Sequence, residues 1–128
     1  MEIEVFVVSA FGMNETGGNP AGIVLEAEGL SDSQMLHIAA EVGLSETAFL
    51  FSSDSCDFLL RFFTPAAEVD LCGHATIATY SLLHRLGKVA AGSYRQELLA
   101  GSIGHSYWGR WFDFHGTIRS RLRRHISS

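Results

Sequence analysis

Glu46 is the first residue whose type and position suggest proton chemistry. It lies in the run Ser-Glu-Thr-Ala-Phe at residues 45–49, between an expected helix and an expected strand. A carboxylate at the mouth of an apolar strand can move protons if burial raises its pKa. Taken alone, a glutamate is more often a solvated surface residue. Both interpretations of Glu46 stay open on this evidence.

A second candidate site is the segment of residues 63–76, where Cys72, Gly73 and His74 lead into an expected helix. The free N–H groups and the positive dipole end of a helix start favour a carboxylate or a phosphate. His74 could donate a proton or a hydrogen bond there, or could simply bond to nearby backbone. Cys72 is either a poised thiolate or, as we favour, a small buried apolar residue.

A third candidate is the glycine-rich run at residues 17–22, which contains Asn19. Glycines that join two strands let the backbone approach a ligand closely, although a structural turn is the plainer interpretation. The run has neither the P-loop pattern nor the dinucleotide-binding pattern. The six histidines and two cysteines show no His-x-x-x-His or Cys-x-x-Cys spacing, so we expect no bound metal.

The elements that must position these residues alternate along the chain. A first helix is expected to begin at the N-cap Ser31, with Gln34 as its capping-box partner, and to end at Gly43. Its apolar stripe is Met35, Ile38, Ala39 and Val42. Four strands are expected, at residues 4–8, 21–25, 46–51 and 57–63.

A second helix is expected from Gly73 to about Leu86, with Gly87 as its C-cap. Its buried stripe should be Ala75, Ala78, Leu82 and Leu86. Strands that alternate with two helices favour an α+β domain with helices packed on a mixed sheet.

Composition narrows the class of protein. Hydrophobic residues make up 47% and charged residues 18% of 128 residues, which excludes a disordered chain and fits one compact domain. No run approaches the length of a membrane span, so no membrane association is expected. Two cysteines are too few for a disulfide scaffold and favour a reducing, cytoplasmic setting.

The net charge of −5 is unevenly distributed. Residues 1–99 carry four Lys/Arg against thirteen Asp/Glu, a balance of −9, whereas residues 100–128 carry five Arg against one Asp, a balance of +4. The acidic body argues against a nucleic-acid surface, and the basic tail is too short to favour one. We therefore expect no nucleic-acid partner.

The character of the sequence changes after Gly101. A strand pair is possible at residues 103–107 and 111–114, and the last dozen residues show no core-facing pattern. We therefore divide the chain into residues 1–101, a domain, and residues 102–128, a divergent basic tail that looks truncated or frame-shifted.

Four motifs in a fixed order carry a resemblance to a known family. They lie at residues 18–22, 45–49, 61–65 (followed by Glu68-Val69) and 71–76. Together they resemble the N-terminal half of the PhzF-like, or phenazine-biosynthesis-like, isomerases, over about residues 3–101. One motif would be weak evidence, but four in order are specific.

The resemblance implies a diaminopimelate-epimerase-like fold, in which two halves, each a mixed β-sheet rolled around a central helix, face each other across a cleft. It also implies that the chain is related to cofactor-independent biosynthetic isomerases that act on small carboxylate-bearing substrates. One member moves a double bond in a dihydro-hydroxyanthranilate on the way to phenazines. By motif, Glu46 is the general acid/base, and Gly73, His74 and Asn19 bind the substrate. Cys72 stands where related epimerases keep a catalytic cysteine, but PhzF-like enzymes use the glutamate instead.

Family members are about twice as long as this chain, and their second half supplies an aspartate and a second glycine-rich loop. The alternative to an isomerase is therefore an incomplete half-domain that binds a partner or self-associates. The missing half also predicts a homodimer or larger assembly that sets two copies of Glu46 across one cleft. In that arrangement, Phe49 and Phe63 are expected near the rim of the open face.

Overall fold

The structure is a computed structural model that describes residues 2–10, 19–90, 92–98, 101–107 and 117–123. Glycines 17 and 18 and the expected strand at residues 111–114 lie outside these ranges. The described elements, in chain order, are β1 (Glu2–Ala10), β2 (Asn19–Val24), α1 (Asp32–Val42), β3 (Thr47–Phe51), β4 (Phe58–Phe63), β5 (Glu68–Val69), α2 (Gly73–Arg85), β6 (Gly92–Leu98), β7 (Gly101–Tyr107) and β8 (Thr117–Arg123).

The described strands form one mixed sheet in the order β7-β6-β4-β3-β2-β1-β8, with β5 beside β4. The pairs β2–β3 and β4–β6 are parallel and the other pairs are antiparallel. Parallel neighbours need a long crossover, which α1 supplies for the first pair and α2 for the second. The predicted α+β class is therefore correct.

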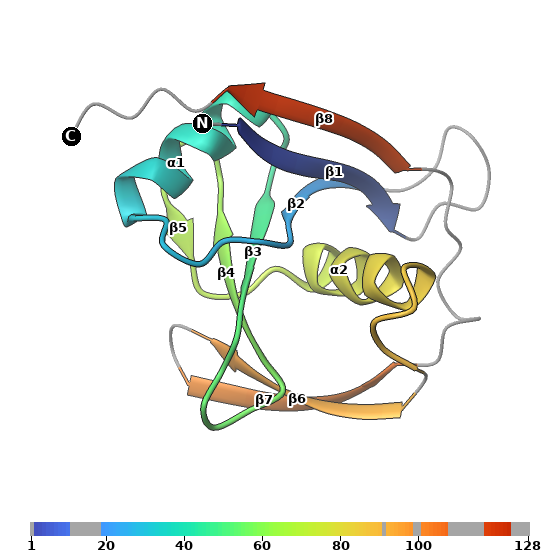
Figure 1. Cartoon of the computed structure of the whole chain (residues 1–128). Coiled ribbons are helices and arrows are strands. Elements are labelled where there is room, and N and C mark those ends of the chain that lie inside the picture. Colours follow the sequence, from blue (N-terminus) through green and yellow to red (C-terminus); the bar gives the residue numbers. More distant parts are fainter. Residues whose placement is uncertain (1, 11–18, 91, 99–100, 108–116, 124–128) are drawn as a thin grey trace.

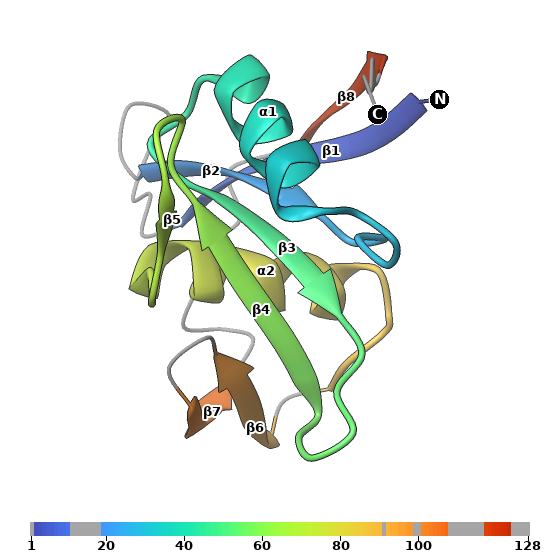
Figure 2. The same cartoon turned by 90° about the vertical axis from the view of Figure 1, so that its left-hand side faces the viewer.

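The sheet bends around α2. Figure 1 shows β1, β2 and β8 on one side of α2 and β6 and β7 on the other. Figure 2 shows β3 and β4 spanning the distance between these two groups, in front of α2. The result is the mixed sheet rolled around a central helix that the family resemblance implied.

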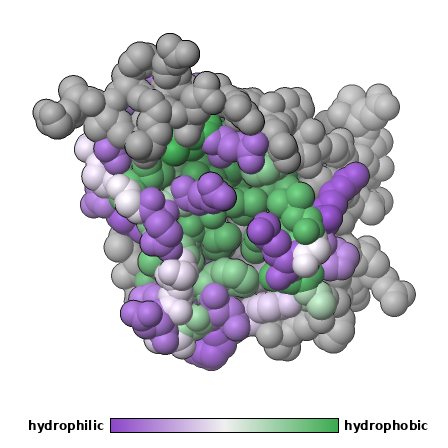
Figure 3. Space-filling view, viewed as in Figure 1, coloured by the Kyte–Doolittle hydropathy of each residue, from purple (hydrophilic) through white to green (hydrophobic). Residues whose placement is uncertain are grey.

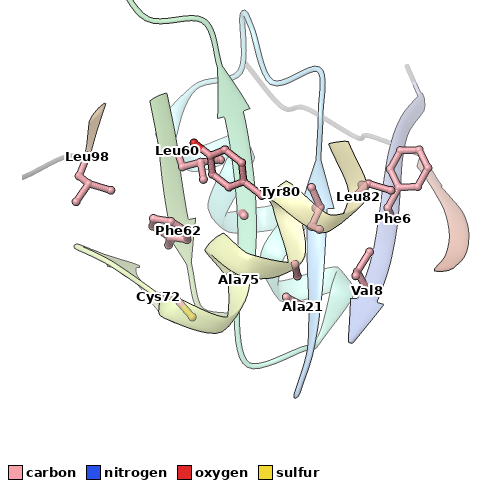
Figure 4. Packing of buried hydrophobic residues seen from close by; sticks show 13 residues of the cluster. Phe6, Val8, Ala21, Leu60, Phe62, Cys72, Ala75, Tyr80, Leu82 and Leu98 are labelled. Carbon is pink, nitrogen blue, oxygen red and sulfur yellow. The ribbon is translucent and has the colours of Figure 1, made fainter. Parts of the chain in front are cut away.

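Buried side chains lie on both faces of the sheet. Successive side chains of a strand point to opposite faces. In β1, Phe6 and Val8 belong to a core cluster that includes α2, whereas Ile3 and Val5 belong to a second cluster that includes α1. Figure 4 shows the first cluster, in which Tyr80 and Leu82 of α2 lie among residues of the strands. The sheet thus separates a core around α2 from a core under α1.

Helix α1 has the predicted ends. The Ser31 hydroxyl accepts a hydrogen bond from the Gln34 backbone N–H at 3.2 Å, and the Ser31 N–H donates to the Gln34 side chain at 2.9 Å. Gly43 caps the other end in the left-handed region, at φ 72°. The predicted stripe is correct, with Val42 less buried than the other members.

Helix α2 is more buried than its predicted stripe required, since eight of its residues are buried. Ala75, Ala78 and Leu82 are buried as predicted. The prediction for Leu86 was wrong: it is the C-cap residue after the last helical residue, Arg85, and it is 42% exposed although its N–H still donates to the Leu82 carbonyl. Gly87, at φ 75°, follows the cap instead of forming it.

The placement of Phe49 and Phe63 near an open rim was also wrong. Both are buried in the core under α1, where their rings meet edge to face with centroids 5.5 Å apart. The guanidinium of Arg61 lies 5.5 Å from the centre of the Phe63 ring and binds both Glu68 and Asp32. This network joins β4 and β5 to the start of α1.

Strand β8 lies within the last dozen residues, where the sequence showed no core-facing pattern. It pairs antiparallel with β1, with Arg119 opposite Phe6 and Arg121 opposite Glu4. Strand pairing satisfies backbone N–H and C=O groups and does not require apolar side chains. The division of the chain at residue 101 stays a prediction. Neither described helix is long and apolar enough to cross a bilayer.

Candidate active site

Three reactive side chains meet where β3 begins and α2 starts. One potential ligand atom each from Glu46, Cys72 and His74 lie within 4.8 Å of one another. The His74 Nε2 atom is 3.2 Å from the Glu46 Oε2 atom, and the His74 Nδ1 atom is 3.3 Å from the Cys72 sulfur. The imidazole therefore lies between the carboxylate and the thiol. The sequence placed Glu46 and His74 in separate motifs, and the fold brings them into contact.

The backbone holds both sides of this cluster. The Glu46 carbonyl accepts a hydrogen bond from the Gly22 N–H at 3.1 Å, which ties the residue to β2. A Cβ atom on Gly22 would lie 3.0 Å from the Thr47 hydroxyl oxygen, so a residue without a side chain lets β2 approach β3 this closely. For Gly22, the structural interpretation of the glycine-rich run is therefore sufficient.

The start of α2 is fixed in a similar way. The backbone N–H and the hydroxyl of Thr76 both donate to the Cys72 carbonyl, at 3.0 and 2.9 Å. Cys72 is the N-cap residue, and its side chain makes no capping hydrogen bond. The amides of His74 and Ala75 nevertheless face the Cys72 sulfur closely enough to act on the pKa of its thiol, so an anion that binds this helix start would lie beside that sulfur.

The cluster is half-buried and open on one side. The side chains of Glu46 and His74 are 21% and 18% exposed, and Cys72 is buried. Gly73 is exposed, and a Cβ atom built on it would meet nothing within 4 Å. A side chain at this first residue of α2 would therefore meet open space among the described residues.

The Glu46 Oε2 atom is itself buried and has no hydrogen-bond partner among the described residues. Its 3.2 Å contact with His74 lacks hydrogen-bond geometry, so it stabilises the pair by charge only when His74 is protonated. A buried carboxylate oxygen with its lone pairs unused can accept a proton or bind a cation.

Burial raises the pKa of the Cys72 thiol, and the charge of Glu46 raises it further, although the amides of Ala75 and His74 act in the opposite direction. At neutral pH the thiol is therefore protonated. This agrees with our preference for Cys72 as a small buried residue over a poised thiolate.

Asn19 opens β2 opposite Ala10 of β1, but its side chain lies outside what the structure describes. Its substrate-binding role stays a prediction. Leu71 belongs to the motif at residues 71–76, directly precedes the cluster and is 48% exposed.

A hollow of about 350 Å³ lies elsewhere, at the other end of α2. Its lining is Ile3, Glu4, Phe6, Val24, Leu25, Glu26, Leu50, Phe58, Leu83, Leu86 and Lys88. Apolar surface occupies the middle of the face that Figure 3 shows, with hydrophilic side chains around it. None of the three clustered residues lines this hollow, so the reactive cluster and the hollow are separate features.

A comparison with known protein families identifies the family of this chain. The family described as "Phenazine biosynthesis-like protein" matches residues 8–111. The chain belongs to this family. The predicted resemblance to the PhzF-like family is thereby confirmed.

Among the relatives is the "Uncharacterized isomerase YddE" of Escherichia coli K12, which is 44% identical over 101 residues, 79% of this chain and 34% of the relative. A human phenazine biosynthesis-like domain-containing protein is 43% identical over 91 residues, 65% of this chain and 31% of its own length. The chain thus spans about a third of the relatives it matches, as expected for the N-terminal half.

Solved structures agree. The Bacillus anthracis PhzF-family protein superposes with a TM-score of 0.77 at 43% identity, covering 81% of this chain and 35% of its own. A hydroxyproline epimerase from Agrobacterium vitis superposes with a TM-score of 0.59 at 10% identity, over 82% of this chain and 37% of its own. The second match shows the fold alone, and that fold is the epimerase-like one.

Proposed function

We propose that this chain is the catalytic-base half of a cofactor-independent PhzF-like isomerase, with Glu46 as the general acid/base. The observation that carries the proposal is the contact of the Glu46 carboxylate with His74 at an open helix start. The substrate class we propose is a small carboxylate with an acidic carbon. Its carboxylate would lie against the uncapped amides that begin α2.

The proton transfer has two steps. Glu46 removes a proton from the carbon next to an electron-withdrawing group of the substrate, and the electron pair of the C–H bond moves into that group. The protonated Glu46 then returns a proton to another carbon or to the opposite face, and the electron pair forms the new C–H bond. Donors at the start of α2 stabilise the charge that develops between the two steps.

His74 and Cys72 have different parts in this proposal. His74 places its ring between the Glu46 carboxylate and the Cys72 thiol, and when protonated it would stabilise the carboxylate by charge. Because the pKa of the Cys72 thiol is raised, a thiolate base is scarce at neutral pH. This difference supports Glu46 over Cys72 as the base. No bound cofactor is needed for the reaction, and its absence stays a prediction.

Glu46→Gln tests the proposal, because it keeps the shape of the side chain and removes the base. Solvent-deuterium incorporation into a panel of small carboxylates, including a dihydro-hydroxyanthranilate, is measured by mass spectrometry. We expect incorporation to fall by about a hundredfold or more. The matched control is Glu41→Gln on the exposed face of α1, which should leave the rate unchanged.

Equal incorporation by the Glu46→Gln variant and the parent would overturn the assignment of the base. A folded parent protein that incorporates no deuterium into any member of the panel would favour the alternative, a half-domain that binds a partner without catalysis.

We further propose that a second copy of the chain covers the open side of the cluster. Leu71 is 48% exposed beside Cys72, and an apolar side chain at that position favours burial against a partner. A symmetric pair would set two Glu46 side chains across one cleft. Light scattering coupled to size-exclusion chromatography tests this over a wide concentration range. Leu71→Ser should shift the protein toward the monomer, and a parent that is monomeric at high concentration would contradict the dimer.

A further inference from the structure

Glu46, Cys72 and His74 offer one oxygen, one sulfur and one nitrogen ligand within 4.8 Å of one another. The His74 Nε2 atom is 3.2 Å from the carboxylate oxygen and 3.9 Å from the sulfur. Ligands of a tetrahedral Zn²⁺ ion lie at about 2.0–2.3 Å from the metal, which places them roughly 3.3–3.8 Å from each other. The carboxylate oxygen is already close to this range from Nε2, whereas the sulfur is nearer to Nδ1, so the His74 ring must turn to bring all three ligands to one ion.

The donor set selects the class of metal. Thiolate and imidazole ligands favour Zn²⁺ and similar borderline or soft divalent cations over Mg²⁺ and Ca²⁺, which prefer oxygen. Three protein ligands leave the fourth position of a tetrahedral ion for water or another ligand. The buried Glu46 Oε2 atom, which has no hydrogen-bond partner among the described residues, is an independent sign that this group can take a cation.

We propose that this cluster is a binding site for Zn²⁺ or a chemically similar divalent cation, and that the ion inhibits the enzyme. On binding, the Cys72 S–H bond breaks, its proton goes to solvent, and the sulfur forms a bond to the metal. The same ion takes the lone pairs of Glu46 that would accept a substrate proton. The inhibition, unlike the binding, rests on the function proposed above.

The sequence predicted no metal, because it shows none of the usual ligand spacings. Those spacings describe pairs of ligands that lie a few residues apart in one segment. Here the carboxylate lies before β3 and the other two ligands lie at the start of α2, so only the fold brings them together.

The binding test uses the full chain without a metal-affinity tag. Titration with Co²⁺ should produce a thiolate-to-cobalt charge-transfer band and the strong visible bands of a tetrahedral site. Displacement by Zn²⁺ then gives the Zn²⁺ affinity. Cys72→Ala should abolish the charge-transfer band and weaken Zn²⁺ binding by about a hundredfold or more, since even outer partners of metal ligands contribute tenfold to a hundredfold.

The matched controls are Cys56→Ala and His37→Gln, which change the other thiol and an exposed histidine. Both should keep the cobalt spectrum and the Zn²⁺ affinity of the parent. If Cys72→Ala fails to fold, protection serves instead: one equivalent of Zn²⁺ should shield Cys72 of the parent from iodoacetamide, as read from the mass of its peptide.

The metal site would be overturned if neither Co²⁺ nor Zn²⁺ bound stoichiometrically at micromolar concentration. It would also be overturned if Cys56→Ala abolished the charge-transfer band, or if Zn²⁺ left Cys72 open to iodoacetamide. The two proposals fail separately. Deuterium incorporation without metal binding would remove the metal site and keep the enzyme. Metal binding without incorporation would keep the site and remove the enzymatic function. Incorporation that Zn²⁺ leaves unchanged would overturn the inhibition.

Discussion

The two ends of α2 differ in what they offer a ligand. At its start, the polar side chains of Glu46 and His74 lie beside Cys72 and an open helix terminus. At its end, the hollow of about 350 Å³ is lined by eight apolar and three charged residues, and the last turn carries His84 and Arg85. The helix dipole favours anions at the first end and cations at the second.

A pocket with convergent polar groups is the usual first guess for an active site. In this protein the three reactive groups converge at the start of α2, and none of them lines the hollow at its other end. If the two ends are independent, substitutions at one end should leave the other unaffected.

The largest effect on stability is expected near the apolar end of α2. Leu82→Ala removes a fully buried side chain from the core around α2, which should lower the free energy of unfolding by about 2–5 kcal/mol. His74→Gln, at the polar end, should change it by less than about 1 kcal/mol, since a partly exposed ion pair contributes little. Urea unfolding monitored by circular dichroism measures both. Equal losses would show that the cluster is part of the structural core.

An intermediate effect on stability is expected when a glycine is replaced by alanine at each end of α2. Gly87→Ala forces a side chain into the left-handed region at φ 75° and should cost about 1–2 kcal/mol. Gly73 is not a left-handed glycine and has free space for a Cβ atom, so Gly73→Ala should stay within about 0.5 kcal/mol of the parent.

For activity, Gly73→Ala should have the larger effect and Gly87→Ala the smaller one. A methyl group at Gly73 would displace a substrate bound at the helix start and reduce deuterium incorporation by about tenfold or more. Gly87→Ala should leave the incorporation of the folded fraction unchanged. If Gly73→Ala has full activity, the substrate does not approach this helix start.

The smallest effect is expected at Glu28, in the loop after β2 on the side of the hollow. Its carboxylate accepts hydrogen bonds from the N–H and the hydroxyl of Ser52, at 2.8 and 2.9 Å, and these lower its pKa. A carboxyl group with a lowered pKa in the folded state stabilises the fold above its unfolded pKa, and this contribution is lost as the pH falls through the folded value.

Glu28→Gln should therefore be slightly less stable than the parent at neutral pH, and the difference should vanish in acid. Urea unfolding at a series of pH values measures it, and Glu26→Gln serves as the control. A difference that is constant over the whole range would mean that the charge of Glu28 is not its source.

Local features were predictable from the sequence because they depend on residues a few positions apart. The capping box of Ser31 and Gln34 and the left-handed Gly43 fix α1 through bonds within one turn. Leu86 was misjudged for the same reason: its helical spacing is correct, but the chain leaves the helix one residue before it. A pattern of spacings does not locate that exit to the residue.

The family resemblance predicted Glu46, Gly73 and His74 for one site, although no local rule connects them, and the fold brings Glu46 and His74 into contact. The burial of Phe49 and Phe63 and the pairing of β8 with β1 were not predictable, because each depends on what the other side of the sheet or its edge meets. Strand periodicity shows that two faces exist, and it does not show which face is covered.

The sequence by itself determined the order of β1–β4 and the two helices, the ends of α1 and the family, whereas β5, β6 and β8 were not predicted. Only the tertiary structure decided that Glu46 lies against His74 and Cys72, that this cluster is apart from the hollow, and that three ligand types meet there. The physical reason is that helix caps and strand alternation depend on nearby residues. Contact between the start of β3 and the start of α2 depends on how the whole sheet rolls around the helix.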